Sequence, residues 1–257
     1  MKHITLLLLF IGGFILNANA QPPTYDDLVI LFSDADYEKL LKKAEKYTQS
    51  DKSRKDAIPY LYLSKANFEI SKGGEQEELL AKYPRAFKES IKYAGKCIQK
   101  DKEGIVVADN MAHFTNLKVV VTEILRNLAE SGDFGRLMGQ IPLMIKVDKK
   151  DIGAYYLKAA AYYYKKDITG MKKTAKLADE MLKTADPNAF TISEDDDFDL
   201  TNKKKADINM LKLGVINYAR ALVLARQKEG AKDIMGKVKQ WFEEDEEFKA
   251  VYDEIVN

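Results

Sequence analysis

The chain has 257 residues, of which 46% are hydrophobic and 32% are charged. Its 41 basic and 40 acidic side chains leave a formal net charge of only +1. This balance argues against a dedicated nucleic-acid-binding protein, which needs a basic face to neutralise phosphates, and against a general attraction to anionic membranes. Cys97 is the single cysteine, so an internal disulfide is excluded.

The first twenty residues have the pattern of a cleavable secretory signal peptide. Lys2 supplies a positive start, residues 4–16 are mainly apolar, and Ala18 and Ala20 are small residues of the kind that a signal peptidase reads. The apolar run is shorter than the roughly 20 residues that a membrane-spanning helix needs. An uncleaved anchor or a buried core helix is the alternative.

The predicted cleavage site bears on localisation. Gln21 follows it, where a bacterial lipoprotein would have a cysteine, so a lipid anchor is not expected. Removal of residues 1–20 would leave residues 21–257 as one mature helical domain, with no further segment long and apolar enough to enter a membrane. We expect a periplasmic protein of a Gram-negative bacterium, with secretion as the alternative.

Apolar residues in the mature chain recur every three or four positions, which is the period of an amphipathic helix. Residues 33–36 are typical of a helix start, and residues 48–55 of a helix end. Helical hairpins are expected after that, the first with a long insertion over residues 72–83. Their first helices are expected around residues 60–68, 124–128, 154–166 and 213–218, their second helices around 86–98, 137–144, 171–184 and 230–238, and a closing helix around 246–255.

The third hairpin spans about 34 residues and has Tyr155, Ala159 and Tyr162 along its first helix. This order of a large, a small and an aromatic residue resembles the tetratricopeptide repeat (TPR) family, whose period is about 34 residues. Ala178 matches a small position on the second helix, and Pro187 ends that helix. In the family, these small residues let the two helices of a hairpin approach closely.

The resemblance extends with lower fidelity over most of residues 55–242, and Lys158 departs from it because the family prefers an apolar residue there. It implies an all-α fold: an irregular TPR-like, right-handed α-solenoid of about four helical hairpins with a C-terminal capping helix. An irregular helical bundle without a superhelical groove is the alternative.

Few side chains of the mature chain suggest catalysis or metal binding. His113 is its only imidazole and Cys97 its only thiol, whereas a zinc site normally needs several such ligands. No triad of serine, histidine and acid and no glycine-rich phosphate loop is recognisable. We expect His113 to be a surface or helix-capping residue, Cys97 to be buried, and the protein to be no enzyme and to hold no cofactor or metal.

The acidic run over residues 194–199 has aspartates in alternation, as an oxygen-rich calcium loop might. An EF-hand loop, however, requires glycine and glutamate at the positions that Leu200 and Ala206 occupy here. Weak calcium binding stays open as an alternative. The simpler interpretation is a solvated connection whose charge caps a helix starting near Thr201.

Five tyrosines fall on the predicted first helix of the third hairpin and cover more than one face, so they cannot all be in the core. In TPR arrays the first helices line a concave peptide-binding surface. Tyrosine suits such a surface because it offers a large contact area for little loss of entropy. We expect at least one of Tyr156, Tyr163 and Tyr164 to face this concave groove, where a partner would bind; packing against neighbouring repeats is the alternative.

The resemblance and the predicted export together suggest a non-catalytic scaffold or adaptor that binds a protein or peptide partner in the concave face of the array, as in a cell-envelope assembly or secretion machine. A small-molecule or glycan binding protein of the cell envelope is the alternative. Trp241, the single tryptophan, offers little stacking surface for sugars.

Overall fold

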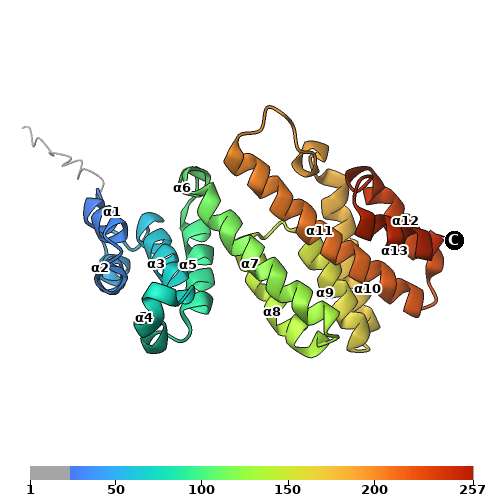
Figure 1. The fold of residues 1–257 in the computed structure, drawn as a ribbon, viewed down its shortest axis with the longest axis horizontal. Coiled ribbons are helices and arrows are strands. Elements are labelled where there is room, and N and C mark those ends of the chain that lie inside the picture. Colours follow the sequence, from blue (N-terminus) through green and yellow to red (C-terminus); the bar gives the residue numbers. More distant parts are fainter. Residues whose placement is uncertain (1–23, 257) are drawn as a thin grey trace, which may run out of the picture.

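The computed structural model describes residues 24–256, which form thirteen α-helices and no strand. This result confirms the all-α fold class. The helices lie side by side along one long axis, with α1 and α2 at one end and α12 and α13 at the other (Figure 1). The predicted signal peptide, residues 1–20, lies outside the described residues. Within residues 24–256, no helix is both long and apolar enough to cross a membrane.

Most of the expected helices are present with short connections between them. The N-terminal half contains α1 (Asp26–Ser33), α2 (Tyr37–Gln49), α3 (Ile58–Ser71), α4 (Glu77–Lys82), α5 (Ala86–Lys100), α6 (Ile105–Asp109) and α7 (Met111–Glu130). The C-terminal half contains α8 (Phe134–Val147), α9 (Ile152–Tyr164), α10 (Ile168–Thr184), α11 (Phe198–Leu224), α12 (Lys228–Val238) and α13 (Glu246–Val256). Three short 3-10 turns are η1 (Gly74–Gln76), η2 (Pro187–Phe190) and η3 (Lys239–Trp241).

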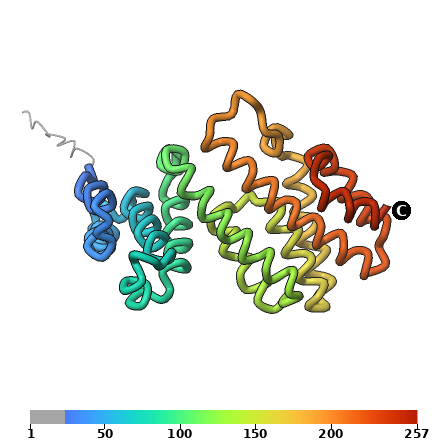
Figure 2. Tube along the Cα trace, in the orientation of Figure 1, coloured from blue at the N-terminus to red at the C-terminus, as the bar shows by residue number. Residues whose placement is uncertain are grey.

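Consecutive helices pack in pairs: α3 on α5, α7 on α8, α9 on α10, and α11 on α12. The expected insertion in the first pair contains η1 and α4. Helix α11 is the longest, with 27 residues, and it crosses both α7 and α9 (Figure 1). The connection from α10 to α11, which includes η2, arches out of the stack beside the start of α11 (Figure 2).

Four of the turns between helices share one backbone geometry. At each, a residue with positive φ ends one helix, and the next residue's N–H bonds to a carbonyl five residues earlier, which is the Schellman motif. The positive-φ residues are Ala35, Gly132, Lys166 and Arg226. In three of these turns the following aspartate also caps the next helix, since its side chain accepts a hydrogen bond from a backbone N–H three residues on. One turn therefore both ends a helix and starts the next.

The tightest helix crossing joins α9 to α11. A Cβ added at Gly153 would collide with the Met210 carbonyl, and one added at Gly214 would collide with the carbonyl of Gly153. The two backbones can approach this closely because both residues lack a side chain. The crossing fixes α11 across α9 and so places the middle of α11 against the start of α9.

One expectation about local structure needs a small adjustment. Helix α11 begins at Phe198 rather than near Thr201, and the capping residue is Asp197, which accepts a hydrogen bond from the Leu200 N–H at 2.8 Å. The acidic run therefore does cap a helix. Cys97 is buried as expected, and burial raises the pKa of its thiol to about 12.

Candidate functional site

A hollow with a volume of about 1050 Å³ lies at the junction of the two halves. We call it the Lys118 cleft. One wall comes from α6 and the start of α7, and the opposite wall comes from α9, α10 and η2. Its walls are mostly apolar, with Val107, Met111 and Phe114 on one side and Tyr155, Leu177, Met181 and Phe190 on the other.

A buried charged cluster forms the floor of this cleft. The Lys118 ammonium, on α7, lies 2.9 Å from Asp148, 2.5 Å from Asp151 and 2.5 Å from Asp207. Three carboxylates thus match the three N–H donors of one ammonium. Burial alone would lower the pKa of Lys118, but the three negative charges outweigh burial and hold the pKa above its ordinary value. Lys118 is therefore a permanently charged group.

Each carboxylate of the cluster also has a second partner, which for Asp148 is the Lys150 N–H at 2.9 Å. Asp151 caps α9 by accepting a hydrogen bond from the Ala154 N–H at 2.6 Å. Asp207 accepts a hydrogen bond from the ammonium of Lys203 at 2.7 Å. The ion pairs of Lys118 with Asp151 and Asp207 connect α7, α9 and α11 at the bottom of the cleft. The cluster is internally saturated, so it offers a rigid polar floor rather than a reactive group.

This cluster was not anticipated, although the sequence contains a signal for it. Phe114, Lys118, Val121 and Leu125 follow a helical spacing, so a lysine occupies a position in an otherwise apolar stripe. A charge in that position must be buried and must find opposite charges. The sequence does not show which of its 40 acidic residues supply them, because Asp207 is far away along the chain.

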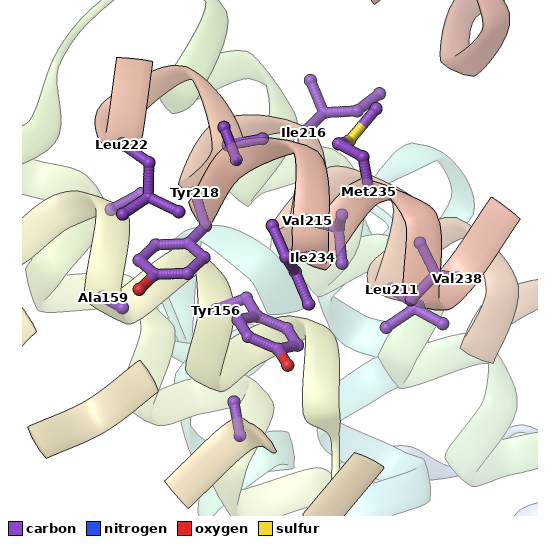
Figure 3. Close-up of a cluster of buried hydrophobic side chains, with 14 of the residues drawn as sticks. Tyr156, Ala159, Leu211, Val215, Ile216, Tyr218, Leu222, Ile234, Met235 and Val238 are labelled. Atoms are coloured by element: carbon purple, nitrogen blue, oxygen red, sulfur yellow. The ribbon is translucent and has the colours of Figure 1, made fainter. Parts of the chain in front are cut away.

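The three tyrosines singled out as partner-binding candidates lie elsewhere. Tyr156 has 0% of its surface exposed and lies beside Tyr218 among aliphatic side chains of α11 and α12 (Figure 3). Its hydroxyl donates a hydrogen bond to Asp179 at 2.6 Å. The expectation for Tyr156 is therefore corrected. Its side chain lies against α10 and α11, so it is a core residue and offers no free surface.

Tyr163 and Tyr164 are partly exposed at the far end of α9, and neither lines the Lys118 cleft. The ring of Tyr164 stacks on Phe134 at the start of α8. Contact of these two residues with a partner stays a prediction. The tyrosine that does line the cleft is Tyr155, which is half-buried at the start of α9.

His113 is also corrected, because it is buried rather than on the surface. It lies near the start of α7 with 9% of its surface exposed, and its Nε2 lies 2.9 Å from the Ser64 hydroxyl. That hydroxyl donates to the Ser90 carbonyl, so the imidazole is the donor to Ser64. Burial, aided by the charges of Lys65 and Lys72, lowers the pKa of His113 to about 3.

The pairing of serine and imidazole raises the question of nucleophilic catalysis. A catalytic serine needs a histidine that is oriented by a third group and that titrates near neutral pH, together with access for a substrate. Ser64 and Ser90 are fully buried, and His113 stays neutral in the folded protein at physiological pH. This cluster therefore joins α3, α5 and α7 as a neutral polar contact.

Part of the acidic run over residues 194–199 bonds to other groups of the chain. Asp196 pairs with the buried Lys204 ammonium at 2.8 Å, and Asp197 caps α11. Among residues 24–256, no group of three or more histidine, cysteine or acidic side chains is arranged to hold a metal ion. Two of the carboxylates in the run are thus engaged by the chain itself.

No family model and no curated protein matches this sequence.

Proposed function

We propose that this chain is a non-catalytic scaffold or adaptor that binds a segment of a partner protein in the Lys118 cleft. The observation that carries the proposal is the cleft itself: mostly apolar walls above a charged floor that is already saturated. Ligand-binding hollows of this kind combine apolar lining with a few fixed polar groups. The fold that presents the cleft is, in this proposal, an irregular TPR-like α-solenoid of about four hairpins with α13 as a cap.

The repeated turns support the solenoid part of the proposal. Gly132 and Lys166 have the same positive-φ role in Schellman turns and are separated by about one repeat of 34 residues. The same turn geometry recurs at Ala35 and Arg226, although with longer spacing. Short turns of one geometry between packed antiparallel helices are what a helical repeat requires.

The apolar wall supports docking of a polypeptide. Leu177 on α10 is 43% exposed, although it is a large aliphatic side chain with a neighbouring apolar wall to pack against. Burying such a side chain against a partner contributes about 1.5–3 kcal/mol. Because the carboxylates below it are already paired, a partner would not need to compensate them. Binding would thus come mainly from apolar contact inside the cleft, with orientation from charged residues at its rim.

The proposal of an exported, periplasmic or secreted location rests on the sequence pattern of residues 1–20 alone. The proposal that the protein is non-catalytic rests on the two buried polar clusters. Lys118 is saturated by carboxylates, and Ser64 and His113 have no route to a substrate. In both clusters, side chains that resemble catalytic groups are used to join helices.

Site-specific photo-crosslinking in the producing cell tests the proposal. A photoreactive side chain at Leu177 should give adducts with a defined protein, identified by mass spectrometry. Ile168 is a matched control, because it lies on the same helix with 42% exposure but outside the cleft. The adduct should disappear when Met181 is changed to glutamate. Equal adducts at both positions, or none at Leu177, would overturn the proposal.

A small-molecule or glycan binding protein is the second candidate, and one observation favours it. The cleft volume of about 1050 Å³ is close to the upper range of small-molecule sites, and Tyr155 provides an aromatic wall. Native mass spectrometry of the protein purified from its own cells distinguishes the two. A bound small molecule that is lost in a Leu177→Glu variant favours this second function.

A further inference from the structure

A second hollow adjoins the Lys118 cleft and has a different character. It lies between α5 and the end of α8 and has a volume of about 560 Å³. Four lysines line it: Lys92, Lys96, Lys146 and Lys149. No carboxylate is among its lining residues. We call it the basic groove.

The backbone brings these lysines together. Lys92 and Lys96 are one helical turn apart on α5 and therefore share a face. Gly95 lies between them, and a Cβ at this position would be 3.4 Å from the Lys146 carbonyl oxygen. The end of α8 therefore lies close to α5 at Gly95. The groove is thus a product of helix packing rather than of a lysine-rich loop.

Most of the positive charge in the groove is uncompensated within the described residues. Of the four lysines, only Lys92 has an ion pair there, with Glu89 on its own helix. The ammonium groups of Lys92 and Lys96 lie 4.9 Å and 5.4 Å from the ring centre of Tyr93. The ring holds both cations near one another. Four like charges in one hollow attract an anionic ligand.

We infer that the basic groove binds an acidic stretch of the partner polypeptide whose neighbouring apolar residues occupy the Lys118 cleft. Lys149 and Tyr155 line both hollows, so the two are continuous and one extended segment can fill both. This inference rests on the proposed function, because it names the chemistry of the same partner. The expected partner segment has aspartate or glutamate next to an apolar residue that anchors it in the cleft.

The composition of the groove favours carboxylates over nucleic acid. Four lysines in a hollow of this size suit a few carboxylates, whereas a nucleic acid needs a long basic track. Tight phosphate sites commonly use arginine forks or helix N-termini, and this groove has neither, since it lies at the C-terminal end of α8. Lysine ammonium groups are flexible point charges that can follow a run of carboxylates.

Fluorescence anisotropy with two labelled peptides tests the inference. One probe is Leu-Phe-Leu followed by six glutamates, and the other is Leu-Phe-Leu followed by six glutamines. We expect the acidic probe to bind at least tenfold more tightly, and the preference to shrink between 50 and 200 mM salt because it is electrostatic. A Lys96→Glu, Lys146→Glu double variant should lose the preference while its circular dichroism stays unchanged.

A Lys172→Glu, Lys173→Glu double variant is the matched control. These exposed lysines on α10 lie outside both hollows, and the charge change is identical. The control should keep the tenfold preference. If it loses the preference as the groove variant does, or if wild type binds both probes equally, the acidic-segment inference is wrong while the apolar cleft stands. If neither probe binds, the proposed function fails as well.

Discussion

Two helix crossings, α9 with α11 and α5 with α8, have glycine at the point of contact, but the two backbones lie closer together at the first. At the first, a Cβ on Gly153 or Gly214 would collide with the opposing backbone. At the second, a Cβ on Gly95 would stand at 3.4 Å from the Lys146 carbonyl, which is ordinary contact. The tight crossing helps to fix the floor of the Lys118 cleft. The looser one leaves room for the basic groove.

The lysines of the Lys118 cleft and of the basic groove also differ in their surroundings. Lys118 is buried and held by three carboxylates, whereas Lys96, Lys146 and Lys149 line a hollow without acidic residues. A buried charge without partners is too costly to keep, so the first lysine must be structural. An exposed lysine stabilises the fold little, which leaves the second set free for binding. The following variants test this contrast.

The largest expected effect is for Lys118→Met. Removing the ammonium leaves three carboxylates facing one another in a buried site, which should lower the free energy of unfolding by about 3–5 kcal/mol at neutral pH. Chemical denaturation measures this change. Lys149→Met is the control, since a surface substitution of this kind stays within about 0.5 kcal/mol. Equal effects for the two variants would show that Lys118 is not the central charge of the cluster.

The next largest effect is for Gly214→Ala. Alanine normally stabilises a helix interior relative to glycine by about 1 kcal/mol. Here the new methyl group would collide with the Gly153 carbonyl, so we expect a net loss of about 3 kcal/mol as α11 is pushed away from α9. Gly236→Ala on α12 is the control, because nothing lies within 4 Å of its Cβ position, and it should stabilise. A stabilising effect at both positions would contradict the tight crossing.

The sequence predicted these regions unequally. The helical period predicted the paired helices and the buried Cys97, because periodicity is a local property. It did not predict which face of α9 is buried: Tyr156 is in the core and Tyr155 lines the cleft. That choice depends on where α11 crosses, and the crossing is fixed by Gly214, far along the chain. The burial of His113, which was expected to be a surface or helix-capping residue, could not be predicted for the same reason, since Ser64 and Ser90 come from other helices.

A smaller effect is expected from His113 as pH falls. Its pKa is lowered to about 3 in the folded protein but is near 6.5 in the unfolded chain. Below pH 6.5 the unfolded state binds a proton that the folded state does not, so stability falls as pH falls. Between pH 7.5 and 5.5 the free energy of unfolding should fall by about 1.4 kcal/mol.

Denaturation at several pH values measures how steeply the free energy of unfolding changes with pH. A His113→Asn variant should have a lower stability at pH 7.5 but a flatter profile between pH 7.5 and 5.5. Persistence of the full slope in that variant would assign the titration to another group. Lys118 stays charged over this range, but burial raises the pKa of Asp151, so a slope that remains in the variant would point to this cluster.

The smallest effect is expected for Gly95→Ala at the looser crossing. The methyl group would meet the Lys146 carbonyl at an ordinary contact distance, while alanine favours the helix, so stability should rise by no more than about 1 kcal/mol. Thermal denaturation measures the change in stability, and the anisotropy assay measures binding of the acidic probe. A loss of more than about 1 kcal/mol would mean that α5 and α8 pack as tightly as α9 and α11. Unchanged stability with weaker binding of the acidic probe would instead show that the spacing of the two helices matters for the groove rather than for the fold.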